Sequence, residues 1–275
     1  MNTLITIVMF LFGSVIGSFL NVVILRYRTG RSVGGRSACF SCDKKLSWYE
    51  LVPIASFATQ RGKCTGCQAR ISWQYPIVEA ITGILFVLLY ARFAYLLPTM
   101  PLLFGILFAY YAFIASVLVV LSAYDMRHKI LPDGLTMLFA GAAFVGMFFL
   151  KGDALILHVP GIWDLCAGIL LPAPFALIWL ISKGKWMGLG DAKLMIGIGF
   201  LLGMSGGITA VLLSFWIGAA FSIMLLILGG FVKRGGVFSM KMAIPFGPFL
   251  ALSTLLAVIW QLDLGFIAQM FGGSF

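Results

Sequence analysis

Long apolar segments separated by short polar ones run through most of the chain. Eight of them are apolar enough, and close enough to about 20 residues, to cross the roughly 30 Å hydrocarbon core of a bilayer as helices. They cover approximately residues 4–25, 77–97, 101–124, 134–150, 163–182, 191–204, 208–231 and 244–263. This pattern predicts an all-α polytopic membrane protein with about eight transmembrane helices embedded in the lipid bilayer.

Composition agrees with a membrane protein. Hydrophobic residues make up 61% of the 275 positions and charged residues only 10%, which excludes an ordinary soluble domain. The first apolar segment has no basic residue before it, and its small residues (Gly13, Ser14, Gly17 and Ser18) favour helix packing over signal-peptide cleavage. We therefore expect it to be retained as a helix.

One long polar segment, residues 26–76, interrupts the apolar pattern. It suggests a division into a first transmembrane helix (1–25), a polar insert (26–76) and a bundle holding the second to eighth helices (77–275). An insert of this size has too little core to fold well alone, so we expect it to need an additional stabilising element.

The net charge of +10 does not indicate nucleic-acid binding, because the basic residues are distributed by topology. With the N-terminus outside and eight spans, the segments 26–76, 125–133, 183–193 and 232–243 fall on one side and hold 17 of the 19 Lys and Arg residues. The positive-inside rule makes that side cytoplasmic and the N-terminus periplasmic.

Four of the five cysteines form two C-x2-C pairs in the polar insert: Cys39 and Cys42, then Cys64 and Cys67. Two such pairs can bring four thiolates to one point, which is the tetrahedral coordination of a structural zinc site. Iron could occupy the same ligands. Disulfides are disfavoured because the insert is expected in the reducing cytoplasm.

Two acids, Asp125 and Asp191, occupy the cytoplasmic ends of distant apolar segments and should lie at similar depth. Ionisable groups at this depth suggest function. Two carboxylates that share a site can divide the roles of base and acid, activating a water and protonating a departing amide, as in aspartic proteolysis. Gly188 and Gly190 would allow unusual backbone conformations and close approach of another chain.

Simpler interpretations exist for the individual residues. Asp191 can be an acid in the first turn of a helix, Asp133 in "LPDG" can cap the next helix, and Glu79 can be a solvated first-turn acid. Lys129 and Lys193 are expected to anchor helix ends at the lipid headgroups. A transporter that relays ions or protons through the buried acids and a scaffold that docks proteins through the cysteine insert remain alternatives.

Several motifs follow one another along nearly the whole chain: "GSVIGSFLNVVILR", the paired cysteine insert with "RGKC", "ISWQYPIVEAITG", "YDMRHKILPD", "MGLGDAKLM" and "IPFGPFLA". In this order they resemble the bacterial prepilin peptidases, the bifunctional leader peptidases and N-methyltransferases of type IV pilus and type II secretion systems. Phe40 departs from the pattern, since family members often have proline there, but the four cysteines are intact.

The resemblance implies an intramembrane aspartic protease of the G-x-G-D class in the bacterial inner membrane. Asp125 and Asp191 match the catalytic pair, with Gly188, Gly190 and Asp133 in supporting positions. The implied substrates are prepilins or pseudopilins with a short basic leader. The implied second activity is methylation of the new N-terminal amine with S-adenosylmethionine, to which Glu79 is a candidate contributor. The motifs specify no oligomeric state.

Overall fold

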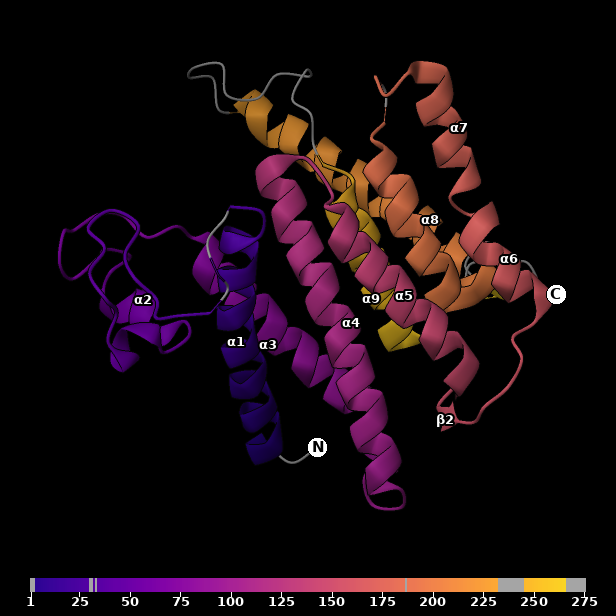
Figure 1. Cartoon of the computed structure of the whole chain (residues 1–275), viewed down its shortest axis with the longest axis horizontal. Helices are drawn as coiled ribbons and strands as arrows, with labels where there is room; N and C mark the ends of the chain where they lie inside the picture. The colour runs from indigo at the N-terminus through magenta and orange to yellow at the C-terminus, as the bar shows by residue number, and fades with distance from the viewer. Residues whose placement is uncertain (1–2, 30–31, 33, 186, 232–244, 266–275) are drawn as a thin grey trace. The chain divides into compact units, whose positions relative to one another are not determined.

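A computed structural model describes residues 3–29, 32, 34–185, 187–231 and 245–265, which are mostly helical (Figure 1). In chain order the elements are α1 (Thr3–Arg26), η1 (Trp48–Leu51), α2 (Ala55–Thr59), α3 (Gln74–Phe93), η2 (Ala94–Leu96), α4 (Pro101–His128), α5 (Asp133–Phe149), β1 (Leu150–Lys151), β2 (Ala154–Leu155), α6 (Ile162–Leu170), α7 (Ala173–Ser182), α8 (Leu189–Phe231) and α9 (Gly247–Trp260). The chain forms two compact units, Met1–Ala123 and Tyr124–Phe275. The sequence-based division at residues 25 and 76 stays a prediction.

Within the described ranges, five helical stretches are long and apolar enough to cross a membrane. They are Thr3–Arg26, Gln74–Leu96, Pro101–His128, Ile162–Ser182 and Leu189–Ile227. Two shorter apolar helices, α5 and α9, occupy two further expected spans. The helical membrane architecture is confirmed, whereas the count of eight crossings stays a prediction. The basic segment 232–243 lies outside the described residues.

The two segments expected at 191–204 and 208–231 lie within one assigned helix, α8, which breaks at Gly203. This glycine has φ 67° and ψ −169°, a conformation that residues other than glycine rarely adopt. The carboxylate of Asp164, in the first turn of α6, occupies the place where a side chain at position 203 would point. The break therefore coincides with a close contact between α6 and α8.

In the first unit, α1 and α3 pack through small residues. A methyl group added at Gly13 would lie 2.8 Å from the Cβ of Phe86, and one at Gly17 would lie 2.8 Å from the Cα of Glu79. Ser14, on the same stripe of α1, is buried. Gly and Ser at this spacing let two helices approach closely in a bilayer, as the sequence of α1 predicts.

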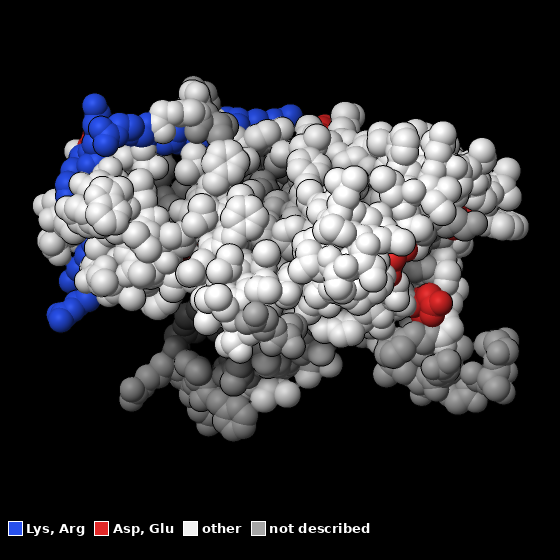
Figure 2. Space-filling model, turned by 90° about the horizontal axis from the view of Figure 1, so that it is seen from below, with Lys and Arg blue, Asp and Glu red and all other residues white. Residues whose placement is uncertain are grey.

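The insert between α1 and α3 carries two short helices, η1 and α2, and two isolated β-bridges, Ala38 to Lys45 and Lys63 to Arg70. Figure 2 shows Lys and Arg side chains gathered around the insert, while the face drawn of the apolar helices carries very little charge. The insert is thus a polar, basic element attached to an apolar helical protein.

In the second unit, α8 is the helix that the others share, because it packs against α5, α6, α7 and α9. Glycines on α8 make this packing close: a methyl group at Gly199 would lie 2.6 Å from the backbone of Ala167 in α6. The N-terminal turn of this shared helix carries Asp191. The scaffold thus fixes one of the two acids of interest at the end of its most contacted helix.

Candidate active site and metal centre

Asp125 occupies the last turn of α4 and is only 5% exposed. The helix ends three residues later, and Lys129 turns the chain away with φ 55° while its N–H donates to the Asp125 carbonyl at 2.7 Å. The carboxylate therefore sits on the last helical turn, just before the "KILPD" segment. This is the helix-end position that the hydropathy pattern predicts.

Asp191 lies in the first turn of α8, as expected. Gly190 before it packs directly on Leu131, since an added methyl group would lie 2.9 Å from the Leu131 Cβ. Gly188 faces open space, with the nearest atom 3.9 Å from such a group. Neither glycine has a positive φ. Close approach, not an unusual backbone conformation, is the structural reason for Gly190, and Gly188 shows neither feature.

The two aspartates line the same cavity, which has a volume of about 620 Å³. Its polar side chains are those of Asp125, Lys129, Asp133 and Asp191, and its apolar wall includes Leu131, Met187 and Phe246. Segments from around residues 130, 190 and 245 therefore meet at one place. The sequence located the two acids, but it gave no indication that Lys129, Leu131 or Phe246 would border them.

The carboxylate of Asp125 is also in contact with the start of α9. The backbone N–H of Gly247 donates to Asp125 Oδ2 at 3.2 Å, across 122 residues of sequence. A methyl group at position 247 would lie 2.6 Å from the same oxygen. Gly247 belongs to the motif "IPFGPFLA", but its contact with an acid was not foreseen. A glycine next to proline at a helix start is the only local signal for it.

Asp133 and Lys193 form an ion pair, with Lys193 Nζ 2.6 Å from Asp133 Oδ1. The structure therefore joins the N-terminal end of α8 to the first residue of α5. Asp133 is not the residue before the helix: α5 begins at Asp133, with Pro132 in the cap position and no capping side-chain hydrogen bond. The expectation of a simple helix cap is replaced by a cross-link between two helix starts, and Lys193 has a protein partner in Asp133.

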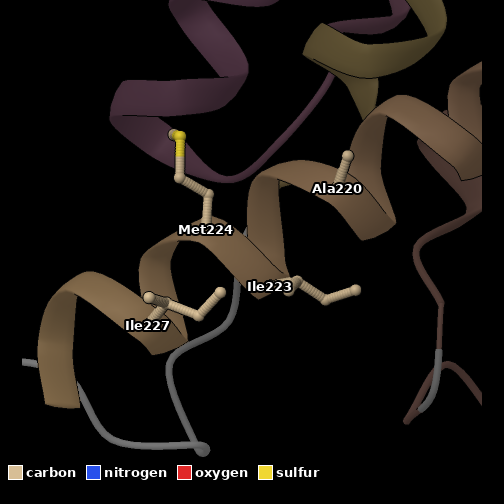
Figure 3. A pocket seen from close by; sticks show the side chains of 4 residues that line it. All are labelled: Ala220, Ile223, Met224 and Ile227. Carbon is tan, nitrogen blue, oxygen red and sulfur yellow. The ribbon is translucent and has the colours of Figure 1, made fainter.

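A second hollow, of about 390 Å³, lies along α8 and has a different character (Figure 3). Its lining side chains, from Ala220, Ile223, Met224 and Ile227, project from one stretch of the helix. These groups are all apolar and none titrates, so this hollow offers no acid–base chemistry. Of the two, only the aspartate cavity combines acids with a basic group.

Glu79 differs from its simplest interpretation as a solvated first-turn acid. It lies beyond the first turn of α3, is 6% exposed, and its Oε2 accepts the backbone N–H of Ile54 at 2.7 Å. Ile54 has φ 61°, an unusual value for a β-branched residue that surrounding contacts must maintain. Glu79 therefore ties the insert to α3. The possible role of Glu79 toward S-adenosylmethionine stays a prediction, and the structure accounts for its Oε2 by the bond to Ile54.

The four cysteines of the insert come together as the spacing predicts. Cys39, Cys42, Cys64 and Cys67 place their sulfur atoms within 4.8 Å of one another, and the sulfurs of Cys39 and Cys67 are 3.8 Å apart. Zn–S bonds of about 2.3 Å in a tetrahedron require sulfur separations of about 3.8 Å. The donor set thus fits a tetrahedral metal ion. Cys166, in α6, is not part of the cluster.

The two cysteine pairs adopt the same local fold. In the first, the N–H of Cys39 donates to Lys44 O, that of Asp43 to Cys39 O, and that of Ser41 to Cys39 Sγ. The second pair repeats these bonds at the same spacing. The N–H of Cys64 donates to Ala69 O, that of Gln68 to Cys64 O, and that of Gly66 to Cys64 Sγ. N–H groups of Cys67 and Gly66 lower the pKa of the Cys64 thiol to about 6, which favours the thiolate that a metal binds.

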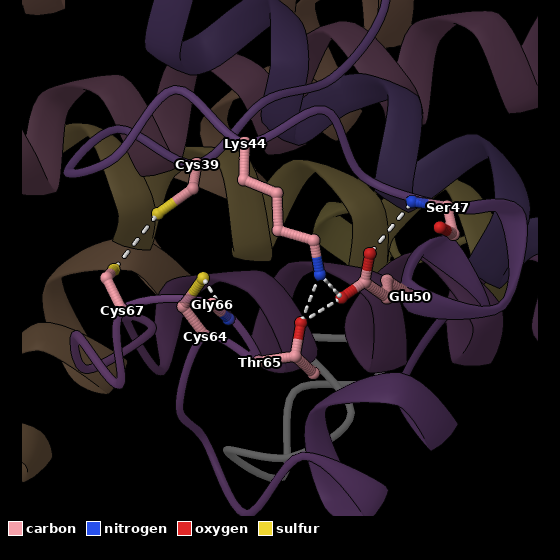
Figure 4. A network of polar contacts seen from close by, with 8 residues as sticks. All are labelled: Cys39, Lys44, Ser47, Glu50, Cys64, Thr65, Gly66 and Cys67. Carbon is pink, nitrogen blue, oxygen red and sulfur yellow. Dashed lines mark hydrogen bonds and ion pairs between the residues drawn. The ribbon is translucent and has the colours of Figure 1, made fainter.

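A buried acid braces the cysteine cluster (Figure 4). Glu50 accepts the N–H of Ser47 at 2.8 Å, the hydroxyl of Thr65, and the ammonium of Lys44 at 3.0 Å. Lys44 comes two residues after the first C-x2-C pair, and Thr65 lies inside the second pair, next to Cys64, so Glu50 connects the two pairs. Together these donors, the Ser47 N–H foremost, lower the pKa of Glu50 to about 2.

Comparison with known proteins relates most of the chain to a single protein family. The family model of the bacterial peptidase A24 N-terminal domain matches residues 11–93, and that of the type IV leader peptidase family matches residues 112–223. A prepilin leader peptidase/N-methyltransferase of Aeromonas salmonicida is 32% identical over 91% of this chain and 89% of its own length. One of Bacillus subtilis is 31% identical over 92% and 93%. The chain belongs to the type IV leader peptidase family.

Membership of the type IV leader peptidase family confirms the resemblance drawn from the motifs and the expectation of an enzyme. The two family models fall mainly in one compact unit each, the first over α1, the insert and α3, and the second over the unit with the aspartate cavity. The alternative of a transporter gains no support from these relatives. No solved structure matches the chain.

Proposed function

We propose that the chain is an intramembrane aspartic endopeptidase that removes the basic leader from type IV prepilins or pseudopilins. The observation that carries this proposal is the cavity that Asp125 and Asp191 line together. Two carboxylates from the ends of two apolar helices provide the pair of acid–base groups that peptide hydrolysis needs. The relatives are named prepilin leader peptidases, which supplies the substrate class.

In the proposed reaction, the scissile peptide bond lies in the aspartate cavity between the two carboxyl groups. The ionised carboxylate removes a proton from water as the water oxygen attacks the carbonyl carbon. The other carboxyl group, still protonated, gives its proton to the departing nitrogen as the C–N bond breaks. One proton is taken up and one is given back, so the pair ends the cycle with one proton between its two groups.

We place the cavity at the cytoplasmic side of the inner membrane and the N-terminus in the periplasm. The support is the charge of the segments next to the aspartates: Lys129 borders Asp125, and Lys183, Lys185 and Lys193 surround Asp191 in sequence. A substrate whose leader is basic would then keep that leader in the cytoplasm while its apolar stem enters the bilayer. This arrangement brings the junction of leader and stem to the depth of the acids.

We also propose that the enzyme methylates the new N-terminal amine, because the relatives carry both activities in their names. The methyl donor implied by the family is S-adenosylmethionine. No step is assigned to it, since Glu79, the residue singled out by sequence, is buried and hydrogen bonded to the insert. The cysteine cluster is proposed to hold a structural zinc ion, which joins the two halves of the insert; Cys39, Cys42, Cys64 and Cys67 would be its ligands.

The test is leader release from a synthetic prepilin peptide by the purified protein in lipid nanodiscs, followed by mass spectrometry. Asp125→Asn and Asp191→Asn each preserve volume but remove the acid–base group, so each should abolish cleavage while leaving the unfolding temperature near that of the wild type. Asp153→Asn, outside the cavity, is the matched control and should cleave normally. Substantial cleavage by either cavity variant would overturn the assignment.

A further inference from the structure

The start of α9 and the carboxylate of Asp125 are joined more closely than any sequence pattern suggests. Gly247 is the first residue of α9, where the helix leaves its own N–H groups without intrahelical partners. One of these groups, the N–H of Gly247, donates to Asp125 Oδ2 at 3.2 Å in a buried position. The donor is therefore used for the carboxylate and not for the helix.

The same position excludes any side chain. A Cβ at residue 247 would lie 2.6 Å from Asp125 Oδ2, well inside van der Waals contact, and 3.4 Å from Leu131 Cδ2. Leu131 is itself 7% exposed, so it has little room to move away. The φ of Gly247 is not positive, so backbone conformation does not require glycine there. What requires it is the space taken by the carboxylate.

We propose that Gly247 is a positioning residue of the active site, whose N–H fixes Asp125 Oδ2 and selects Asp125 as the ionised carboxylate that acts as base. This proposal rests on the function proposed above. Hydrogen bonding to a carboxylate favours its charged form, and the N-terminus of a helix adds to that effect. With Oδ2 held by α9, Oδ1 is the oxygen left to take the proton of the attacking water, and Asp191 supplies the proton to the departing nitrogen.

Other charged groups line the same cavity and must be considered with the carboxylate of Asp125. Asp191 comes from α8, Lys129 from the segment after α4, and Asp133 from the start of α5. Asp133 is bound to Lys193, which offsets its charge. Lys129 supports an ionised carboxylate in the cavity, and Asp191 opposes a second one. If the two carboxyl groups share one negative charge and that charge is on Asp125, the arrangement agrees with all of these neighbours.

The first experiment compares two glycine-to-alanine variants in leader cleavage. Gly247→Ala inserts a methyl group against Asp125 Oδ2, and we expect kcat to fall at least about tenfold, the loss that goes with one hydrogen bond to a charged group. Gly218→Ala is the matched control, because Gly218 lies in α8 and its added methyl group would be 3.5 Å from Phe249 of α9, an ordinary contact. Equal activity of the two variants would contradict the proposal.

The second experiment removes the N–H without adding any atom. Cell-free synthesis with glycolic acid at position 247 replaces the amide by an ester. The ester at position 247 also weakens the Phe246 carbonyl as a hydrogen-bond acceptor, and this carbonyl accepts the N–H of Phe249. The control therefore places phenyllactic acid at position 249, which removes the hydrogen bond to Phe246 O but keeps the N–H of Gly247. Unfolding temperatures of both esters identify any general loss of structure.

The decisive measurement is the pH dependence of kcat. Without the donor, the charged form of the base is less favoured, so the acid limb of the profile should move to higher pH by about one unit in the 247 ester and stay in place in the 249 ester. An unmoved acid limb with wild-type kcat in the 247 ester overturns the proposal. The function proposed above would still stand in that case, because it is tested separately by the loss of cleavage in Asp125→Asn and Asp191→Asn.

Discussion

The ammonium group of Lys193 lies 2.6 Å from the carboxylate of Asp133, and this pair joins the N-terminal end of α8 to the start of α5. Both side chains keep partial contact with solvent, at 33% and 52% exposure. Lys193 follows Asp191 by two residues, and Asp133 lines the aspartate cavity. The pair therefore links the two segments that carry the supporting residues of the proposed active site.

Neutralising this pair should affect catalysis more than stability. An exposed ion pair contributes about 0.2–1 kcal/mol, so Lys193→Met and Asp133→Asn should each lower the unfolding temperature only slightly. Because the pair sets how the start of α8 meets the start of α5, each variant should reduce leader cleavage several-fold. The charge-reversed double variant, Asp133→Lys with Lys193→Asp, should recover part of the activity in a double-mutant cycle. Additive losses in that cycle would show that the two side chains act independently.

The metal centre leads to a simple analytical prediction. Purified protein should contain about one metal ion per chain, and metal analysis should identify it as zinc and not iron. Cys39→Ser or Cys64→Ser should lose the metal, since either removes one of four thiolate ligands. Cys166→Ser is the control, because Cys166 lies in α6 away from the cluster, and it should retain the metal. Metal-free wild-type protein with four free thiols would contradict a metal centre.

Glu50 gives a prediction with a defined pH range. Its pKa is lowered to about 2, so its hydrogen bonds stabilise the folded insert fully above the ordinary carboxyl value of 4.5, and this contribution is lost as pH falls from there toward 2. Glu50→Gln should therefore lower the unfolding temperature by the same amount at pH 7 and at pH 5. Asp43→Asn, an exposed carboxylate of the same insert, should change it little. An unfolding temperature that Glu50→Gln leaves unchanged at both pH values would mean that the pKa is not lowered.

Residue spacing and hydropathy predict the features of this protein that depend on neighbours in sequence. The four-cysteine cluster follows from two C-x2-C pairs, and the helix-end positions of Asp125 and Asp191 follow from where apolar segments stop and resume. The break at Gly203 falls next to the boundary expected between residues 204 and 208. In each case, the sequence signal for the feature is a local motif or the end of an apolar segment, even where its partner lies farther along the chain.

Contacts between distant segments could not be predicted in this way. Glu79 looks like a first-turn acid because hydropathy does not indicate that the backbone of Ile54 will cover it. Gly247 and Asp125 are 122 residues apart, and no periodicity connects them. Lys193 resembles an interfacial anchor until α5 brings Asp133 to it. Burial and pairing of these groups are properties of the packed helices, so they become visible only in three dimensions.

The packing around Leu131 separates the roles of the two glycines in "MGLGDAKLM". A methyl group at Gly190 would lie 2.9 Å from Leu131 Cβ, whereas one at Gly188 would have its nearest neighbour at 3.9 Å. Overpacking a buried contact costs about 1–3 kcal/mol and shifts the backbone that carries it. We therefore expect Gly190→Ala to move Asp191 and reduce leader cleavage at least about tenfold, and Gly188→Ala to retain most of the activity.

A second substitution tests whether the contact with Leu131 is the cause. Leu131→Gly removes the Cβ that a methyl group at position 190 would meet. In the Gly190→Ala background it should restore part of the cleavage, although Leu131→Gly alone should lower activity because it opens the wall between Gly190 and Gly247. If Gly188→Ala proves as damaging as Gly190→Ala, or if Leu131→Gly gives no recovery, then close packing at position 190 does not explain the glycine, and a direct contact of this loop with substrate becomes the better account.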